Sequence, residues 1–153
     1  MTGPDRQAIR EVFAFLRVRD CAAAIAIYQP ALRATDRFRL VEPSGRIGHV
    51  ELRRGPAVLM LSDAFLGNGL DAAAPGTPAY GDVHLQVDNA ESVMVRAVAE
   101  GAEMLTPPTD QFCGERNCLL PGPVGNVWLI GHSTYHVTPE VMQRRCTALR
   151  NGT

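Results

Sequence analysis

The sequence lacks the features that mark several large classes of protein. It has no block of positively charged residues: the 15 basic side chains are mostly spaced singly, and the net charge is −1. Because a phosphate backbone attracts clustered Lys and Arg, we expect no nucleic-acid partner. No apolar run approaches the roughly 20 residues that a membrane-spanning helix needs, so we expect no membrane partner either.

Cysteine is scarce, and its spacing matches no common metal or redox motif. Of the four cysteines, Cys113 and Cys118 are the closest pair, yet they are further apart than in Cys-x-x-Cys, and no second pair completes a zinc set. The first residues, MTGPDRQAIREVF, carry no apolar run after a basic start and so predict no signal peptide. We therefore expect a cytoplasmic chain with free thiols and no cofactor.

What the sequence does contain is a regular alternation in residues 81–89. Apolar and polar side chains follow one another strictly, which predicts a β-strand with one face on a core. The polar face carries Asp82, His84 and Gln86. An acid, an imidazole and an amide in one row indicate a candidate site.

The order of predicted elements occurs twice in the 153 residues. Asp20 and Asn89 are each suited to begin a helix and lie about 70 residues apart. We expect one domain, 1–153, with a module at about 12–63, a second at about 81–132, and a C-terminal helix at about 139–150. The helix after Asp20 is predicted to end or kink near Tyr28, because Pro30 follows. Further strands are predicted at 37–42, 47–53, 57–62, 103–105, 116–120 and 127–132.

Several stretches together resemble one known family. They are FLRVRDCAAAIAIY, GRIGHVELRRGPAVLMLSD, VHLQVDNAESVMVRAVAEGAE, DQFCGERN and PGPVGNVWLIGH. The chain is similar to the glyoxalase/bleomycin-resistance/extradiol-dioxygenase group, the vicinal oxygen chelate superfamily, in its small bacterial glyoxalase-like branch. The resemblance implies an α+β fold in which two β-α-β-β-β modules pair to form a cup-shaped mixed sheet with helices outside. It also implies a homodimer, and leaves open whether one chain or two form the cup.

The implied cup and the alternation together predict which side chains line it. The hairpin is expected to set Glu51 opposite Leu59 and His49 opposite Leu61, while Val58 and Met60 pack beneath the helices. The expected lining is Phe13, Phe15, Arg17, His49, Glu51, Leu59, Leu61, Asp82, His84, Gln86, Val127 and Leu129.

The resemblance also implies a divalent metal held by four side chains. The matching positions are Phe13, Leu59 (or Met60 if the register slips by one), Asp82 and Leu129. Of these, only Asp82 has a donor suited to such a metal, so we expect no metal there. The alternative is a shifted site that combines Asp82 with His49, Glu51 and His84.

For function, we expect a cup that binds a small organic molecule and performs metal-independent acid–base chemistry of the isomerase, lyase or cyclase type. His84 or His49 is the predicted base, because the ordinary pKa of histidine lies near neutral pH. Glu51 is its expected partner, although a salt bridge to Arg17 or Arg53 is the alternative. The expected substrate-binding residues are Phe13, Phe15, Arg17, Asp82, Gln86, Arg116 and Leu129.

Two other functions remain open from the sequence. One is drug sequestration of the bleomycin-resistance type, which needs aromatic walls and no catalytic residue. The other is a metal-dependent lyase or dioxygenase that uses the shifted site. In the first reading Phe13 and Phe15 form a stacking wall, and Arg116 closes over the mouth of the cup.

Overall fold

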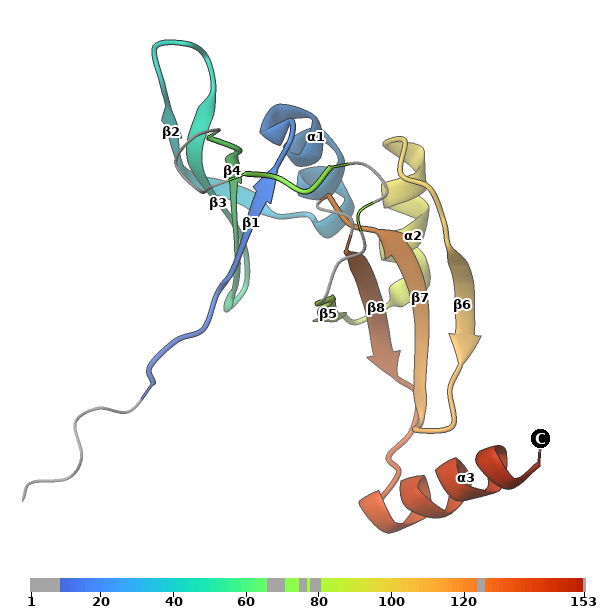
Figure 1. Cartoon of the computed structure of the whole chain (residues 1–153). Coiled ribbons are helices and arrows are strands. Elements are labelled where there is room, and N and C mark those ends of the chain that lie inside the picture. The colour runs from blue at the N-terminus through green and yellow to red at the C-terminus, as the bar shows by residue number, and fades with distance from the viewer. Residues whose placement is uncertain (1–8, 66–70, 75–76, 78–80, 124–125, 153) are drawn as a thin grey trace, which may run out of the picture.

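A computed structural model describes residues 9–65, 71–74, 77, 81–123 and 126–152 (Figure 1). Within these ranges, no helix is long and apolar enough to cross a membrane. The elements of the first module are β1 (Ala14–Val18), α1 (Cys21–Leu32), β2 (Thr35–Val41), β3 (Ile47–Arg54) and β4 (Ala57–Asp63). Those of the second are β5 (Val83–Gln86), α2 (Ala90–Ala99), β6 (Thr106–Asp110), β7 (Glu115–Pro121) and β8 (Val127–Ser133), followed by α3 (Pro139–Asn151).

Each module folds into a four-stranded mixed sheet with the same topology. The strand orders are β1-β4-β3-β2 and β5-β8-β7-β6. In both sheets the first and last strands of the module pair in parallel, and the remaining neighbours are antiparallel. The predicted α+β fold with a duplicated β-α-β-β-β unit is confirmed.

Both predicted helix starts are confirmed by their capping bonds. The carboxylate of Asp20 accepts the backbone N–H of Ala23 at 2.9 Å, and the amide oxygen of Asn89 accepts that of Ser92 at 2.9 Å. Each bond satisfies one of the amide groups that a first helical turn leaves without a partner. These caps fix where each helix leaves its sheet.

The prediction that α1 ends or kinks near Tyr28 is wrong. The helix continues through Pro30 to Leu32 and ends at Arg33, which adopts a left-handed conformation with φ of 51°. Pro30 lies in the last turn, so its missing N–H deprives only the carbonyl of Ala26 of its partner. Ala26 is exposed, and water can bond that carbonyl instead.

The strand predicted at 103–105 is also misplaced, since β6 occupies Thr106–Asp110. Pro107 and Pro108 make a strand unexpected there, because proline has no backbone N–H to donate to a neighbouring strand. β6 pairs with β7 alone and so forms an edge of its sheet. Proline is tolerated in an edge strand because one side of that strand has no ladder to complete.

The hairpin between β3 and β4 corrects the predicted lining of the cup. Its turn has two residues, with Gly55 at φ of 56° followed by Pro56, and Arg54 pairs with Ala57. Glu51 therefore lies opposite Met60, not Leu59. A slip of one residue exchanges the two faces of a strand. Consequently Leu59 and Leu61 are buried in the core, at 8% and 0% exposed, and Met60 lies on the other face.

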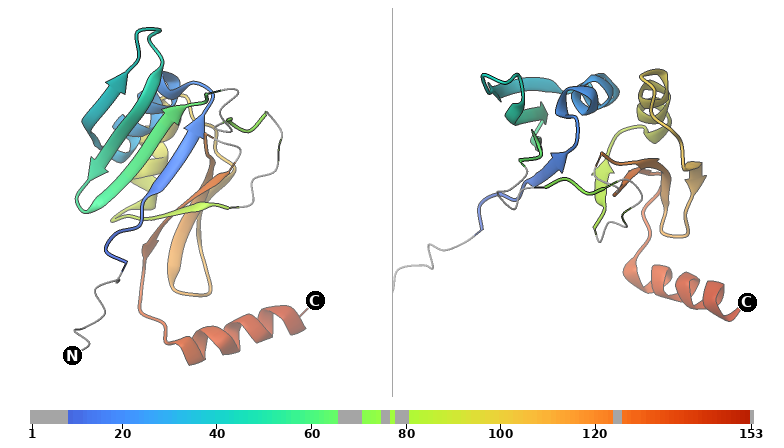
Figure 2. Two further views of the ribbon diagram at one scale, coloured as in Figure 1. Left: turned by 60° about the vertical axis from the view of Figure 1, so that its left-hand side comes forward. Right: turned by 45° about the horizontal axis from the view of Figure 1, so that its top comes forward.

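Two of the helices, α1 and α2, lie between the two sheets. α1 contacts β3 and β4, α2 contacts β7 and β8, and the two helices pack against each other (Figures 1 and 2). Tyr28 of α1 also meets Trp128 of β8, with ring centroids 5.1 Å apart, inside one continuous apolar core. Each sheet consequently turns its second face, which we call its open face, away from the helices. Among the described residues no strand of one sheet pairs with a strand of the other.

Candidate functional site

The open face of the first sheet is an aromatic surface. The ring of His49 lies between Phe15 and Phe38, with centroid distances of 5.3 Å and 5.7 Å. Phe15 is 43% exposed and Phe38 is 45% exposed, so both rings remain available to a ligand or a partner. Phe13 precedes β1 and is also exposed. Rings of this kind offer apolar stacking surface to a flat molecule.

Two polar groups border this surface. Nε2 of His49 lies 3.5 Å from a carboxylate oxygen of Glu51, as expected for an acid–base pair. Arg17 donates to the hydroxyl of Ser62 at 2.8 Å, and its guanidinium carbon lies 4.6 Å from the ring centroid of Phe15. Glu51 thus pairs with His49, and not with Arg17 or Arg53.

The open face of the second sheet carries a polar network. Nε2 of His84 lies 3.4 Å from a carboxylate oxygen of Glu115. The same oxygen accepts a bond of 3.0 Å from the side-chain amide of Asn117, whose own oxygen accepts one of 3.1 Å from Gln111. The His84 side chain is 47% exposed while that of Glu115 is only 16% exposed. The imidazole of His84 is therefore accessible to solvent, and it contacts a carboxylate that neighbouring side chains hold in place.

Gly131 makes this pairing possible. It lies on β8, opposite both Gln86 on β5 and Asn117 on β7. A Cβ atom at this position would lie 2.4 Å from the carboxylate oxygen of Glu115 and 2.6 Å from its Cδ. The Glu115 side chain thus crosses β8 over a gap that only glycine leaves open.

A hollow of about 560 Å³ adjoins the network at the end of the sheet. Its lining includes Glu115 and Ser133 from the open face, Tyr135 and His136 from the following segment, and Met142 of α3. α3 is tied here by Arg145, which donates to the backbone oxygen of Phe112 and to the hydroxyl of Tyr135. The polar face thus continues into a cavity large enough for part of a small ligand.

The other predicted residues of this strand region have structural partners. Gln86 donates weakly to Ser133 at 3.5 Å, and Leu129 lies half-buried beside His84 in the β5–β8 register. Asp82 accepts the backbone N–H of Val127 at 3.0 Å. That bond fixes the start of β8 against β5.

Arg116 does not close over the cup. It lies in register with His132, on the face of β7 that turns toward α2, and pairs with Glu91 and Asp110. The hydrogen bonds that Arg116 donates to Glu91 and Asp110 raise the pKa of Arg116, and the bond to Arg116 lowers the pKa of Glu91. The alternation along β7 sends Glu115 and Asn117 to the open face and Arg116 to the other.

The predicted base residues form two separate pairs, one on each module. His49 joins Glu51 on the first sheet, and His84 joins Glu115 on the second. Among the described residues, no three His, Cys, Asp or Glu side chains gather closely enough to hold a metal. The shifted metal site is therefore not formed within one chain.

In the family that this chain resembles, four positions hold a metal. The side chains at these positions here are not suited to bind one. With the observed hairpin register the positions carry Phe13, Met60, Asp82 and Leu129. Phenyl and alkyl side chains have no donor atom, and a thioether is a poor ligand for a hard divalent ion. The one carboxylate, that of Asp82, already accepts a backbone bond.

Sequence reasoning missed Glu115, Asn117 and Phe38 as site residues. Glu115 lies just outside the strand predicted at 116–120, yet β7 begins at this residue and its side chain reaches His84. The alternation Glu115, Asn117, Leu119 was the available signal, because these side chains share a face. Phe38 was assigned to a strand, but its place beside His49 depends on a bulge in the β2–β3 ladder.

Comparisons with known proteins agree with this architecture. The family model of the Glyoxalase/Bleomycin resistance protein/Dioxygenase superfamily matches residues 10–130. An uncharacterized protein of Mycobacterium bovis, Mb0911c, is 30% identical over 142 residues, covering 90% of this chain and 92% of that protein. The uncharacterized protein Rv0887c of Mycobacterium tuberculosis is 30% identical over 142 residues, covering 90% of this chain and 82% of its own.

Solved structures share the fold at lower identity. TioX from Micromonospora sp. ML1 has a TM-score of 0.64 at 20% identity, covering 81% of this chain and 98% of its own. A glyoxalase/bleomycin resistance protein/dioxygenase from Nocardioides has a TM-score of 0.59 at 21% identity, covering 88% of this chain and 91% of its own. The duplicated module and the match over most of the sequence show that this chain belongs to the Glyoxalase/Bleomycin resistance protein/Dioxygenase superfamily.

Proposed function

We propose that this protein binds a small organic molecule between the open face of the first sheet of one copy and that of the second sheet of another. His84 then moves a proton on the bound molecule, with Glu115 as its orienting partner. The observation that carries this proposal is the exposed imidazole of His84 backed by a half-buried carboxylate at 3.4 Å.

The proposed homodimer is supported by the free strand edges and the exposed apolar face of a single chain. β1 and β5 each have a sheet neighbour on one side only, and such edges favour association. The open face of the first sheet also exposes Phe15, Phe38 and Leu40, which form an apolar surface that a partner can cover. A second copy supplies the missing half of each cup.

The aromatic half supports binding of a flat or apolar molecule. Phe15, Phe38 and His49 present ring faces and edges around one position on the sheet. Arg17 lies next to Phe15 and can bond a carbonyl or anionic oxygen on the ligand. These contacts fix orientation, while the proposed base, His84, lies on the opposite wall.

The polar half supports proton abstraction next to a carbonyl. When Nε2–H of His84 donates to Glu115, Nδ1 keeps its lone pair and can accept a proton. Glu115 then stabilises the imidazolium that forms, and the same proton can be returned to another atom of the substrate. Isomerisation, elimination or cyclisation of a carbonyl compound requires this sequence of transfers and no metal.

Deuterium exchange tests the proposed chemistry. The protein is incubated in D₂O with a panel of aromatic ketones, and loss of the proton next to the carbonyl is followed by NMR. We expect His84→Gln, which keeps the size of the side chain but lacks a base, to slow the catalysed exchange by about 10²-fold or more. Circular dichroism confirms that the variant is folded. Unchanged exchange in folded His84→Gln would rule out the mechanism.

Sequestration is the second candidate, favoured by the aromatic surface around His49. It requires binding alone, so titration calorimetry against aromatic antibiotics separates the two functions. Tight binding with the compound recovered unchanged, as judged by mass spectrometry, supports sequestration. In that case Phe15→Ala weakens binding and His84→Gln leaves it nearly unchanged.

A further inference from the structure

Three arginines line a cleft that residues of both modules form. The cleft has a volume of about 500 Å³ and lies where three elements end. Arg33 follows α1, Arg54 is the last residue of β3, and Arg96 comes from α2. The N-cap residue of α2, Asn89, borders the cleft as well. Residues from both modules therefore build one positively charged recess.

The arginines of this cleft have no carboxylate partner within the part of the chain that the structure describes. Arg54 donates to the backbone oxygen of Arg33 at 3.3 Å, and Arg96 donates through Nε to that of Ala31 at 2.9 Å. Each bond uses one of the five N–H groups of a guanidinium and leaves the others available. Partial burial, and then the positive charges of Arg33 and Arg54, lower the pKa of Arg96.

The charges around the cleft favour an anion with two negative charges. Against the three guanidinium groups stands one lining acid, Asp88. The N-terminal end of α2 adds the positive end of a helix dipole. Guanidinium groups bind phosphate-like oxyanions through paired hydrogen bonds, which also relieves the repulsion among them.

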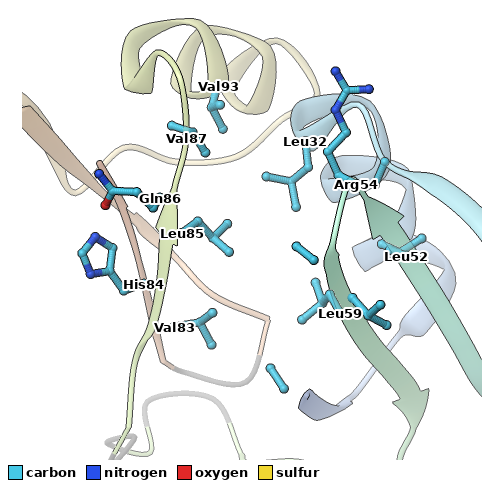
Figure 3. A pocket seen from close by; sticks show the side chains of 14 residues that line it. Leu32, Leu52, Arg54, Leu59, Val83, His84, Leu85, Gln86, Val87 and Val93 are labelled. Atoms are coloured by element: carbon cyan, nitrogen blue, oxygen red, sulfur yellow. The ribbon is translucent and has the colours of Figure 1, made fainter. Parts of the chain in front are cut away.

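An apolar groove of about 280 Å³ continues from the cleft, and the two share Leu32, Arg54, Gln86, Val87 and Val93 as lining residues. Figure 3 shows Val83 and Leu85 of β5 facing Leu59 across this groove. His84 and Gln86 point to the other side of β5. His84 and Gln86 thus border the groove through β5, while the imidazole and amide groups of these two residues face the open side of the sheet.

We propose that the arginine cleft binds a doubly charged oxyanion group, such as a phosphate monoester, whose apolar part lies in the adjoining groove. The ligand class is thus an organic phosphate with a short hydrocarbon body. This site does not depend on the proposed acid–base function, because its anion-binding groups, Arg33, Arg54 and Arg96, take no part in that chemistry.

Calorimetry at constant ionic strength tests this with three probes: inorganic phosphate, n-hexyl phosphate and n-hexanol. We expect inorganic phosphate to bind weakly, hexyl phosphate to bind at least tenfold more tightly, and hexanol alone to bind much more weakly than hexyl phosphate. The double variant Arg33→Gln/Arg54→Gln should weaken hexyl phosphate at least tenfold. Arg144→Gln on α3 removes a distant charge and should leave affinity unchanged.

Each contrary result is decisive. If neither inorganic phosphate nor hexyl phosphate gives binding heat at millimolar concentration, the anion site is overturned. It is also overturned if the folded Arg33→Gln/Arg54→Gln variant binds hexyl phosphate with unchanged affinity. Equal weakening by Arg144→Gln indicates attraction to net charge alone. Equal affinity for inorganic and hexyl phosphate overturns the part of the proposal that concerns the groove. Arg96→Gln serves as a second test only where urea denaturation shows an intact fold, because Arg96 also joins α2 to α1.

Discussion

At the scale of single residues, the polar network depends on one missing side chain. Glu115 reaches His84 across β8 only because position 131 is glycine. The carboxylate is the far end of a flexible side chain, so it moves before the backbone does when the gap is filled. Position 131 consequently controls the pairing without taking part in any chemistry.

We predict that Gly131→Ala displaces Glu115 and breaks its contact with His84. The ring resonances of His84 should move as far as they do in Glu115→Gln, measured by ¹H–¹⁵N NMR. The free energy of unfolding should fall by only about 1 kcal/mol, since one side chain rotates. Gly48→Ala is the matched control, because a Cβ there meets its nearest atoms at 3.9 Å. A Gly131→Ala protein with wild-type His84 resonances contradicts the pairing.

The residue scale also shows why part of the site could not be predicted. β5 and β8 alternate polar and apolar side chains, so their faces followed from the sequence. β4 reads Ala-Val-Leu-Met-Leu, a continuous apolar run in which alternation carries no signal. Which side chains of β4 face the core therefore depends on the length of the β3–β4 turn. The predicted strands leave three residues for the turn, whereas it has two, and this difference placed Leu59 on the open face in place of Met60. A Gly-Pro pair with glycine first is typical of a two-residue type II′ turn, so the signal was present at Gly55.

At the scale of elements, the helices differ greatly in how they are held. α1 and α2 bury side chains in the common core, whereas α3 buries none of its residues. α3 is retained near the second sheet chiefly through Arg145, which bonds Phe112 and Tyr135 and lies 5.7 Å from the Tyr135 ring centroid. The predicted start at Thr138 and Pro139 is confirmed, because cap and proline are local signals.

We predict that Arg145→Ala releases α3 while the rest of the fold stays intact. Amide hydrogens of residues 139–151 should exchange with solvent markedly faster, as measured by mass spectrometry, because few contacts hold them. The free energy of global unfolding should change by less than about 1 kcal/mol. Arg144→Ala, on an exposed neighbouring position, provides the comparison. Equal protection of α3 in both variants would show that other contacts hold the helix.

At the scale of the whole molecule, the position of the helices decides what one chain can do alone. The sequence predicted both modules and most of their strands, since periodicity, caps and glycine turns are local. It could not place the modules relative to each other, because that depends on contacts such as Tyr28 with Trp128, distant in sequence. With α1 and α2 between the sheets, the two halves of a cup face in different directions.

Mixing two inactive variants tests the cup formed by two copies. If each cup combines the first sheet of one copy with the second sheet of the other, a Phe15→Ala/His49→Ala chain and a His84→Gln chain restore each other. Statistical exchange should return roughly a quarter of the wild-type cups, counted by the rate of catalysed deuterium exchange. A cup within one chain predicts no recovery, and sedimentation as a monomer overturns the dimer itself.

Alkaline pH should weaken the fold as a whole through two buried thiols. Burial, and then the Asp63 carboxylate, raise the pKa of Cys21 to about 12, and burial raises the pKa of Cys118. An unfolded chain loses these protons near pH 8.5, while the folded chain retains them. The contribution of these thiols to the free energy of unfolding is therefore fully present below about pH 8.5. Above that pH it declines, by up to about 1.4 kcal/mol per pH unit for each thiol.

Urea denaturation between pH 8 and 10 measures this decline. Cys21→Ala should flatten it, although the variant starts from a lower stability because it leaves a small void. Cys146→Ala, at a partly exposed position on α3, should keep the wild-type slope. In the native protein, iodoacetamide should modify Cys113 and Cys146 well before Cys21 and Cys118. A slope that is the same in all three proteins contradicts the role of Cys21.

The two open faces have a further consequence once they are set opposite each other. One is aromatic, around Phe15 and Phe38, and the other carries His84 and Glu115. In the proposed mechanism His84 alone moves the proton, so a planar substrate held between the two faces exchanges that proton on only one of its sides. Proton delivery to an enol or enolate in such a cup is stereospecific, and a chiral product should form as a single enantiomer.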